Sequence, residues 1–310
     1  MKKQKKNKRR PSFSKSGKAP RTPKEKLKPK NIMSEPQINI MLGKGNDHVS
    51  RNELDQAESI YLRLQSCAPN HAGVQNMLGV VAMQRGKNEV AAKYFQAAQS
   101  LDINVADYPF NLSLALLNVG DAQGAEEASR SALMIRPDYV EAWNMLGLSF
   151  KMRENWLMAS EAFKKALNIN PRYSTAWINQ SGTLTELGHL DEALVAGTNA
   201  VRYGPEFAES HYNLACVLQA YGKDDDAINK FQEALAISPD YADAYVNLSL
   251  SKINLGKYDD SISIAQHAIA IDPRNYSAYV NLGLAFCHKG EYRDGVFYYK
   301  QALEFVPEKF

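Results

Sequence analysis

The order of apolar and polar residues repeats along most of the chain with a period of 34 residues. Proline marks the period at Pro69, Pro137, Pro171, Pro205, Pro239, Pro273 and Pro307, and Ile103 takes the remaining place. With proline at position 32, seven full units start at residues 72, 106, 140, 174, 208, 242 and 276. A fixed period of this length predicts a repeat architecture.

Each unit carries two helical patterns. Positions 4, 7, 8 and 11 form one apolar face, and positions 20, 24, 27 and 28 form a second. Leu occupies position 7 in six of the seven units, and Ala occupies position 27 in all seven. Glycine near position 15 separates the patterns in six units, as a helix C-terminus would, and proline ends the second. The pattern predicts helix A, a tight turn and helix B.

One such pair of helices cannot bury its own apolar faces, so the units must stack into a solenoid. The pattern resembles the tetratricopeptide repeat, with an aromatic residue at 4, Leu-Gly at 7–8, Ala at 20 and 27, and Pro at 32. The stretch AWNMLGLSFKMRENWLMASEAFKKALNINP (142–171) matches it almost throughout, and the resemblance covers residues 72–307. It implies an all-α, right-handed superhelical solenoid of helix–turn–helix units.

We expect a disordered basic tail over residues 1–37, a degenerate first repeat over 38–71, and seven repeats over 72–310. In the degenerate repeat, helix B (ELDQAESIYLRLQSCAP) fits the pattern, whereas helix A (INIMLGKGNDHVS) is interrupted by glycine. With the degenerate repeat counted as the first, four residues of the third and fifth units depart from the pattern: Pro109, Ser129, Gln180 and Gly197.

Position 6 of helix A lies opposite the apolar face, and in arrays that resemble this family that side lines a concave groove. Five units carry asparagine there: Asn111, Asn179, Asn213, Asn247 and Asn281. The neighbouring position 9 is mostly apolar and includes Leu114, Leu148, Leu250 and Leu284. An asparagine amide can pair with both the C=O and the N–H of a backbone. We therefore predict a groove that binds extended polypeptide. The alternatives are that duplication merely copied the asparagines and that the leucines pack on the next repeat.

The segment HYNLACVLQAYG (211–222) is similar in sequence to the repeat region of O-linked N-acetylglucosamine transferases. In that family an asparagine ladder holds the substrate polypeptide. We expect no glycosyltransferase domain after Phe310, and we therefore do not expect the resemblance to carry that chemistry over. We expect a non-catalytic interaction scaffold or adaptor. The alternative is the substrate-recognition region of a larger enzyme of this glycosyltransferase type.

Charge is distributed unevenly along the chain. Residues 1–30 contain 14 Lys and Arg against one acid, a net charge of +13, so the remaining residues carry a net charge of −10. The basic segment could bind nucleic acid, ribosomes or an anionic membrane surface, fold back on the acidic body, or be a solvated arm. Position 2 of helix A is acidic in four units (Asp107, Glu141, Glu209 and Asp243). These acids favour the helix N-terminus, and they could also select basic ligands.

Other chemistry is sparse. The three cysteines form no CxxC pair and the six histidines no metal-ligand spacing, so we expect no metal or cofactor and no enzyme. His211 at position 4 is expected to pack in the core. With no run of 18 apolar residues and no secretory signal, we expect a cytoplasmic protein.

The last helix B, YRDGVFYYKQALEFVP, leaves Phe297, Tyr298 and Phe305 without a following helix to cover them. Solenoids need a polar terminal cap. The array could therefore be truncated, self-associating or capped by a partner.

Overall fold

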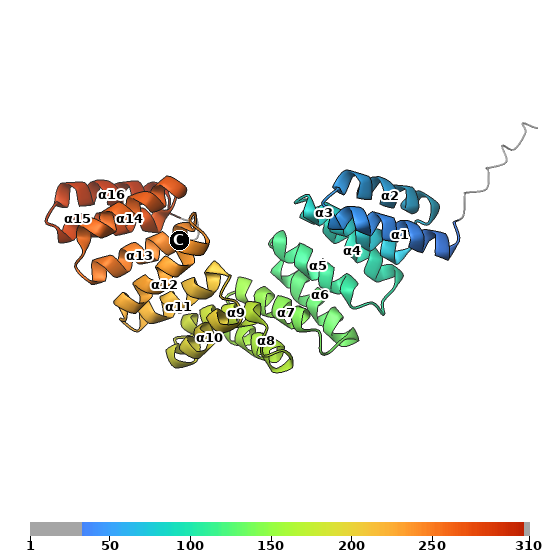
Figure 1. Cartoon of the computed structure of the whole chain (residues 1–310), viewed down its shortest axis with the longest axis horizontal. Helices are drawn as coiled ribbons and strands as arrows, with labels where there is room; N and C mark the ends of the chain where they lie inside the picture. Colours follow the sequence, from blue (N-terminus) through green and yellow to red (C-terminus); the bar gives the residue numbers. More distant parts are fainter. Residues whose placement is uncertain (1–32, 307–310) are drawn as a thin grey trace, which may run out of the picture.

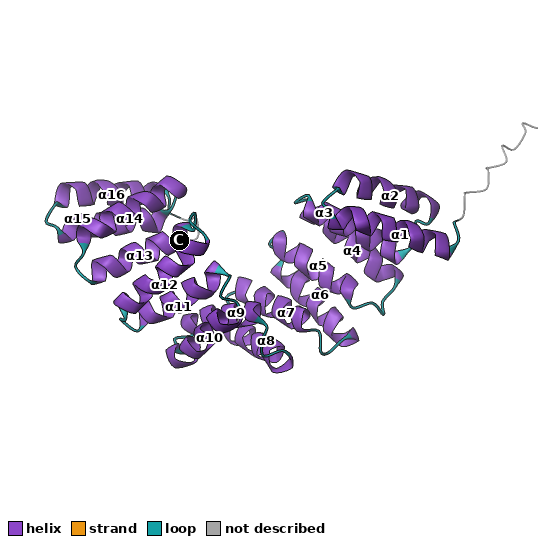
Figure 2. Cartoon of the chain, in the orientation of Figure 1, coloured by secondary structure: helices purple, strands orange, loops and turns teal. Residues whose placement is uncertain are grey.

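The computed structural model describes residues 33–306, so most of the segment predicted to be a disordered tail lies outside the described residues. Every regular element between residues 33 and 306 is a helix (Figure 2). The helices are α1 (Glu35–Ser50), α2 (Leu54–Cys67), α3 (Ala72–Gln84), α4 (Asn88–Leu101), α5 (Asp107–Asn118), α6 (Ala122–Ile135), α7 (Val140–Met152), α8 (Trp156–Ile169), α9 (Ser174–Glu186), α10 (Leu190–Tyr203), α11 (Ala208–Ala220), α12 (Asp224–Ile237), α13 (Ala242–Asn254), α14 (Tyr258–Ile271), α15 (Tyr276–His288) and α16 (Tyr292–Glu304).

The 34-residue period is confirmed as a structural period. From α4 onward, each helix B begins 34 residues after the previous one, from Asn88 to Tyr292. The odd-numbered helices are therefore helix A of each repeat, and the even-numbered helices are helix B. The chain is an all-α solenoid of helix–turn–helix units, as predicted.

The tight turn between helix A and helix B needs a residue in the left-handed conformation. Six repeats place glycine there, with φ between +71° and +84°. Glu154 (φ +56°) and Asn52 (φ +58°) occupy the same place in the other two repeats. Glycine adopts this conformation without steric cost and asparagine tolerates it, so Glu154 is the strained member of the series.

The stacked repeats form an open arc, with α1–α6 in one arm, α11–α16 in the other and α7–α10 between them (Figure 1). The backbones of successive odd-numbered helices, such as α9 and α11, approach each other closely, whereas those of successive even-numbered helices stay farther apart. The odd-numbered helices thus lie on the shorter, concave side of the arc. The even-numbered helices form its convex side.

In seven of the eight repeats the sizes of the residues at positions 8 and 24 are matched, and the exception is Ala215, which shares its repeat with the buried ring of Phe231. Aromatic rings at position 24 pack against glycine in four repeats: Gly45 with Tyr61, Gly79 with Phe95, Gly147 with Phe163, and Gly283 with Tyr299. A Cβ atom added to Gly79 would lie 2.6 Å from the Phe95 ring. Where position 24 is small, position 8 is serine: Ser113 with Ser129, Ser181 with Gly197, and Ser249 with Ala265. The departures at Ser129 and Gly197 are therefore matched within their own repeats.

A second link joins helix A to the turn before it. In five repeats the side chain at position 4 forms a hydrogen bond with the carbonyl oxygen of the proline six residues earlier: Gln75 with Pro69, Trp143 with Pro137, Trp177 with Pro171, His211 with Pro205, and Tyr279 with Pro273. Ile103 takes the place of this proline at the end of the second unit, and Pro109 occupies position 4 of the third unit. The helix A of the third unit therefore lacks a side-chain donor at position 4, and it also follows the one turn that lacks the proline.

The first repeat is better formed than its sequence indicated. Helix α1 is continuous from Glu35 to Ser50, and a capping box between Ser34 and Gln37 starts it. The expectation that glycine would interrupt this helix was wrong. Gly45 is needed there, because a Cβ atom at that position would overlap the buried ring of Tyr61.

The last helix is partly covered by its own repeat. Tyr298 stacks on Phe286 with ring centroids 5.3 Å apart, and Phe305 packs against Tyr279 at the same distance. Of the three aromatic residues predicted to lack cover, Phe297 is the one that stays mostly exposed, at 55%. Three further large side chains of α16 are exposed: Tyr292, Val296 and Leu303.

Candidate functional site

The five asparagines predicted to face the groove tie successive repeats together. Each donates from Nδ2 to the residue 35 positions earlier, on the preceding helix A. The bonds run from Asn111 to Asn76 Oδ1, from Asn179 to Asn144 Oδ1, from Asn213 to the Ile178 carbonyl, from Asn247 to the Tyr212 hydroxyl, and from Asn281 to the Val246 carbonyl, at 2.9–3.0 Å. The row therefore has a structural role that the sequence did not reveal.

This role changes what the asparagines can offer a ligand. Asn247 Nδ2 also lies 3.6 Å from Cys216 Sγ, and Asn281 Nδ2 also donates to Ser249 Oγ at 2.9 Å. At these two residues the amide protons are thus committed within the array. No hydrogen bond from residues 33–306 reaches the Oδ1 atoms of the five asparagines. What the row presents is a set of acceptors, suited to the N–H groups of a backbone or side chain.

The apolar row at position 9 is half-buried. Leu114, Leu148, Leu250 and Leu284 share this intermediate exposure with Val80 and Cys216. Leu148 also packs against the core of its own repeat. The row therefore contributes to packing and still presents apolar surface. Gly182 interrupts it, where an added Cβ would have only Asn213 Nδ2 nearby, at 4.0 Å.

A hollow on the concave side brings several predicted residues together. It lies between α11, α13 and α15 and has a volume of about 330 Å³. Its lining residues are Tyr212, Asp243, Val246, Asn247, Leu250, Tyr276, Ser277, Val280 and Asn281. Two predicted asparagines, one predicted leucine and one acid of position 2 therefore meet in one place. The predicted residues on α5, α7 and α9 do not line it.

Sequence reasoning missed the position-5 residues of the hollow, Tyr212, Val246 and Val280. Their signal was available, because position 5 is adjacent to position 6 and lies on the edge of the same helix face. The residue types vary from Asn to Phe to Val along the chain, so no residue pattern marked the column.

Tyr212, which lines the hollow, and Cys216, which lies next to Asn247, are both kept in the neutral form by burial. Burial raises the pKa of Tyr212, and it raises the pKa of the Cys216 thiol from its ordinary value of 9.0 to about 11. A protonated thiol is a poor nucleophile and a poor metal ligand. Cys216 therefore acts here as a small packing residue beside Asn247.

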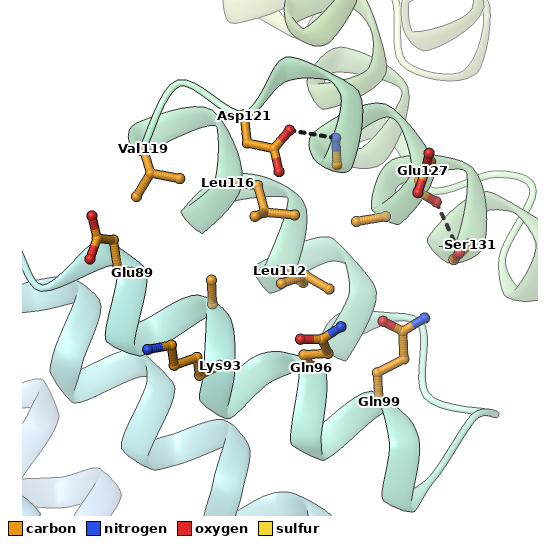
Figure 3. A pocket seen from close by; sticks show the side chains of 13 residues that line it. Glu89, Lys93, Gln96, Gln99, Leu112, Leu116, Val119, Asp121, Glu127 and Ser131 are labelled. Atoms are coloured by element: carbon orange, nitrogen blue, oxygen red, sulfur yellow. Dashed lines mark hydrogen bonds between the residues drawn. The ribbon is translucent and has the colours of Figure 1, made fainter.

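A larger hollow of about 520 Å³ lies on the convex side, between α4 and α6 and over α5 (Figure 3). Gln99 lines it at position 28, where the six later repeats carry Leu, Val or Ile. Part of its polar lining is bonded internally, since Gly124 N donates to Asp121 Oδ1 and Ser131 Oγ to the Glu127 carbonyl, each at 2.9 Å. None of the predicted site residues lies in this hollow.

Among residues 33–306, no three His, Cys, Asp or Glu side chains are grouped as metal ligands would be. His211 is 7% exposed, as expected for a core residue, and bonds to Pro205 O and Glu233 Oε2. No helix in this part of the chain combines the length and apolar character that crossing a bilayer requires.

Family models described as Tetratricopeptide repeat match residues 218–282 in one case, and residues 42–108 and 183–242 in the other. Together these matches span a little over half of the chain. A comparison with curated protein sequences gives no significant match.

Solved structures share the fold. A chain of the APC/C hetero-tetramer Cut9–Hcn1 superposes with a TM-score of 0.67 at 15% identity, over 90% of this chain and 55% of that one. This chain thus spans about half the length of that relative. A tetratricopeptide repeat protein from Parabacteroides merdae gives 0.64 at 18% identity, over 81% and 99% of the two chains. PilF of Pseudomonas aeruginosa gives 0.59 at 17%, over 66% and 93%. With the repeat geometry and the family matches in agreement, the chain belongs to the tetratricopeptide repeat family.

Proposed function

We propose that the protein is a non-catalytic scaffold or adaptor that binds an extended polypeptide along its concave groove. Proteins built from these repeats are in general interaction scaffolds, without catalysis of their own. The observation that carries the finer proposal is the concave hollow, where Asn247, Leu250 and Asn281 come together from two helices.

The groove suits a polypeptide in extended form. Six of the eight helices A add a half-buried apolar side chain at position 9, and four of these six also carry an asparagine at position 6. The Oδ1 atoms can accept backbone N–H groups, each bond contributing about 1 kcal/mol net. Because the asparagine ties already fix the helices relative to one another, binding requires little further ordering of the groove.

Other predictions of partner and setting remain predictions. The family matches identify these repeats in general, without showing closeness to the O-linked N-acetylglucosamine transferase type. The alternative proposal is therefore still that this chain is the substrate-recognition region of a larger enzyme. The proposed anionic partner of residues 1–30 falls outside the described residues. Self-association through the last repeat would use the exposed side chains of α16. A cytoplasmic location stays a prediction.

The test is a pull-down from nuclease-treated lysate, read by mass spectrometry. The groove variant carries Leu250→Glu and Leu284→Glu, which leave the asparagine ties intact. Its matched control carries Leu157→Glu and Leu303→Glu on the even-numbered helices, where the side chains are 63% and 70% exposed. With helicity unchanged in both, the groove variant should lose partners that the control keeps. Equal partner sets for the two variants would refute the groove as the working surface.

A further inference from the structure

The concave hollow contains a hydrogen-bond acceptor to which no donor of residues 33–306 is bonded. Asn281 is only 6% exposed and lines the hollow. Its Nδ2 donates to the Val246 carbonyl and to Ser249 Oγ, each at 2.9 Å. Its Oδ1 accepts no hydrogen bond from residues 33–306. The Oδ1 atom is not among the side-chain atoms of residues 33–306 that are both buried and unpartnered, so it is accessible and can accept a hydrogen bond from a ligand donor.

The orientation of this amide is fixed by its neighbours. Ser249 Oγ donates to the Val246 carbonyl at 2.7 Å, so its remaining lone pairs face the Asn281 amide. Rotating the amide by 180° would place Asn281 Oδ1 against two acceptors, the carbonyl and the hydroxyl oxygen. The oxygen therefore stays on the side of the hollow, independently of any ligand.

A carboxylate without a cationic partner stands at the same hollow. Asp243 is exposed, and it is the one charged residue among the nine that line the hollow. No Lys, Arg or His nitrogen of residues 33–306 lies within 4.0 Å of its oxygens. The equivalent acid four repeats earlier differs, since Asp107 accepts from Arg136 Nη2 at 2.8 Å and from the Tyr139 hydroxyl at 2.9 Å.

The walls between these acceptors are apolar and aromatic. Val246, Leu250 and Val280 supply aliphatic surface, and Tyr212 and Tyr276 supply rings. The volume of about 330 Å³ is at the low end for binding pockets and is large enough for one long side chain. From this combination we infer that the hollow binds an arginine side chain of the polypeptide held in the groove. The inference rests on the proposed function and names the chemistry of its partner.

Arginine fits better than the other long side chains. Its planar guanidinium has donors pointing in several directions, so one head group can serve both the Asp243 carboxylate and Asn281 Oδ1. Its flat face packs on tyrosine rings, and its methylene stem packs on aliphatic walls. Lysine offers a point charge without the planar fork. A glutamate side chain would place its negative charge beside the Asp243 carboxylate, and it would leave Asn281 Oδ1 without a donor.

A selection experiment tests the inference on the intact chain. The full-length protein is used to select from a library of random twelve-residue peptides, and residue enrichment is read by sequencing. Arginine should be enriched at one position, and Asp243→Asn should abolish that enrichment. Peptides selected without arginine preference, or with a preference that Asp243→Asn leaves unchanged, would overturn the inference while leaving the groove proposal intact. Failure to select any groove-dependent peptide would instead refute the proposed function, and this inference with it.

The selected peptide then allows a quantitative comparison by fluorescence anisotropy. Asp243→Asn should weaken binding about tenfold, the usual effect of losing one charge-assisted bond. Glu209→Gln is the matched control, because Glu209 is the exposed acid at the same position of the preceding repeat and lies outside the hollow. It should change binding by less than about twofold. Replacing the peptide arginine by glutamine should cost at least as much as Asp243→Asn. Equal losses from the Asp243 and Glu209 variants would mean general charge attraction and would contradict a specific arginine site.

The basic residues of the chain itself are the competing occupant. A variant in which the 14 Lys and Arg of residues 1–30 are replaced by serine separates the two sources. Unchanged peptide affinity supports a partner as the source of the arginine. Peptide affinity that rises tenfold or more would show that the chain's own segment fills the hollow, and would overturn the assignment to a partner.

Discussion

Asn281 donates from Nδ2 to the main-chain carbonyl of Val246, 2.9 Å away and one repeat earlier. The same offset of 35 residues joins all five asparagines of the row to the preceding helix A. The asparagine row therefore joins successive repeats by hydrogen bonds, in addition to any role in binding a ligand. The groups available to bind a ligand are the Oδ1 atoms of the row and the neighbouring apolar side chains at position 9.

Replacing Asn281 should destabilise the array. Asn281→Ala removes the two hydrogen bonds that Nδ2 donates to the Val246 carbonyl and to Ser249 Oγ, at a cost of about 1–3 kcal/mol. Urea unfolding followed by circular dichroism measures the change. The control is Asn229→Ala on α12, an exposed asparagine, which should change stability by less than about 0.5 kcal/mol. Equal stability of the two variants would argue against a role of Asn281 in joining successive repeats.

The pairing of positions 8 and 24 predicts a clash and its rescue. Gly147→Ser places side-chain atoms against the fully buried ring of Phe163, and overpacking of this kind costs about 1–3 kcal/mol. The double variant Gly147→Ser/Phe163→Ser reproduces the combination found at Ser113 and Ser129.

A double-mutant cycle is the measurement for this pair. The cost of Gly147→Ser should be much smaller in the Phe163→Ser background than in the native chain, because the ring it meets is gone. Additive costs would show that the two positions do not set each other's size.

Relief of backbone strain should stabilise the fourth repeat. Glu154 has φ +56° in the turn where six other repeats carry glycine. Glu154→Gly should therefore raise the free energy of unfolding by roughly 1 kcal/mol. Thermal unfolding shows this as a higher midpoint. Gly188→Ala in the next repeat should lower the midpoint, and a fall for both variants would contradict the strain assigned to Glu154.

Stability at alkaline pH should depend on Cys216. Burial raises its pKa from 9.0 to about 11, so the folded chain keeps a proton that the unfolded chain releases. The resulting contribution to stability is complete below pH 9 and is lost as pH rises to 11. Urea midpoints across this range should fall more steeply for the native chain than for Cys216→Ala. Parallel curves would indicate that the thiol is not desolvated.

Much of the fold follows from the sequence, because helix periodicity, turn glycines and prolines are local signals. Gly45 shows that the role of a residue cannot always be predicted from its neighbours in the sequence. As a sequence element it looks like a helix breaker, and its purpose appears only beside Tyr61, sixteen residues later. The packing of Tyr298 on Phe286 and of Phe305 on Tyr279 is hidden for the same reason.

The candidate site was predicted in outline only. Helix geometry placed Asn247, Leu250 and Asn281 on one face, and the hollow between α11 and α15 contains all three. The acceptors of the asparagine amides could not be foreseen. Two of them are main-chain carbonyls, of Ile178 and Val246, which no residue pattern can mark.

Site-specific photo-crosslinking tests the central claim most directly. A benzophenone amino acid replaces Leu250 on the concave side in one variant and Leu157, 63% exposed on α8, in the other. After irradiation in lysate, position 250 should yield discrete adducts whose peptides map to extended segments of a partner, and position 157 should not. Adducts at position 157 with none at position 250 would place binding on the convex side and contradict the account.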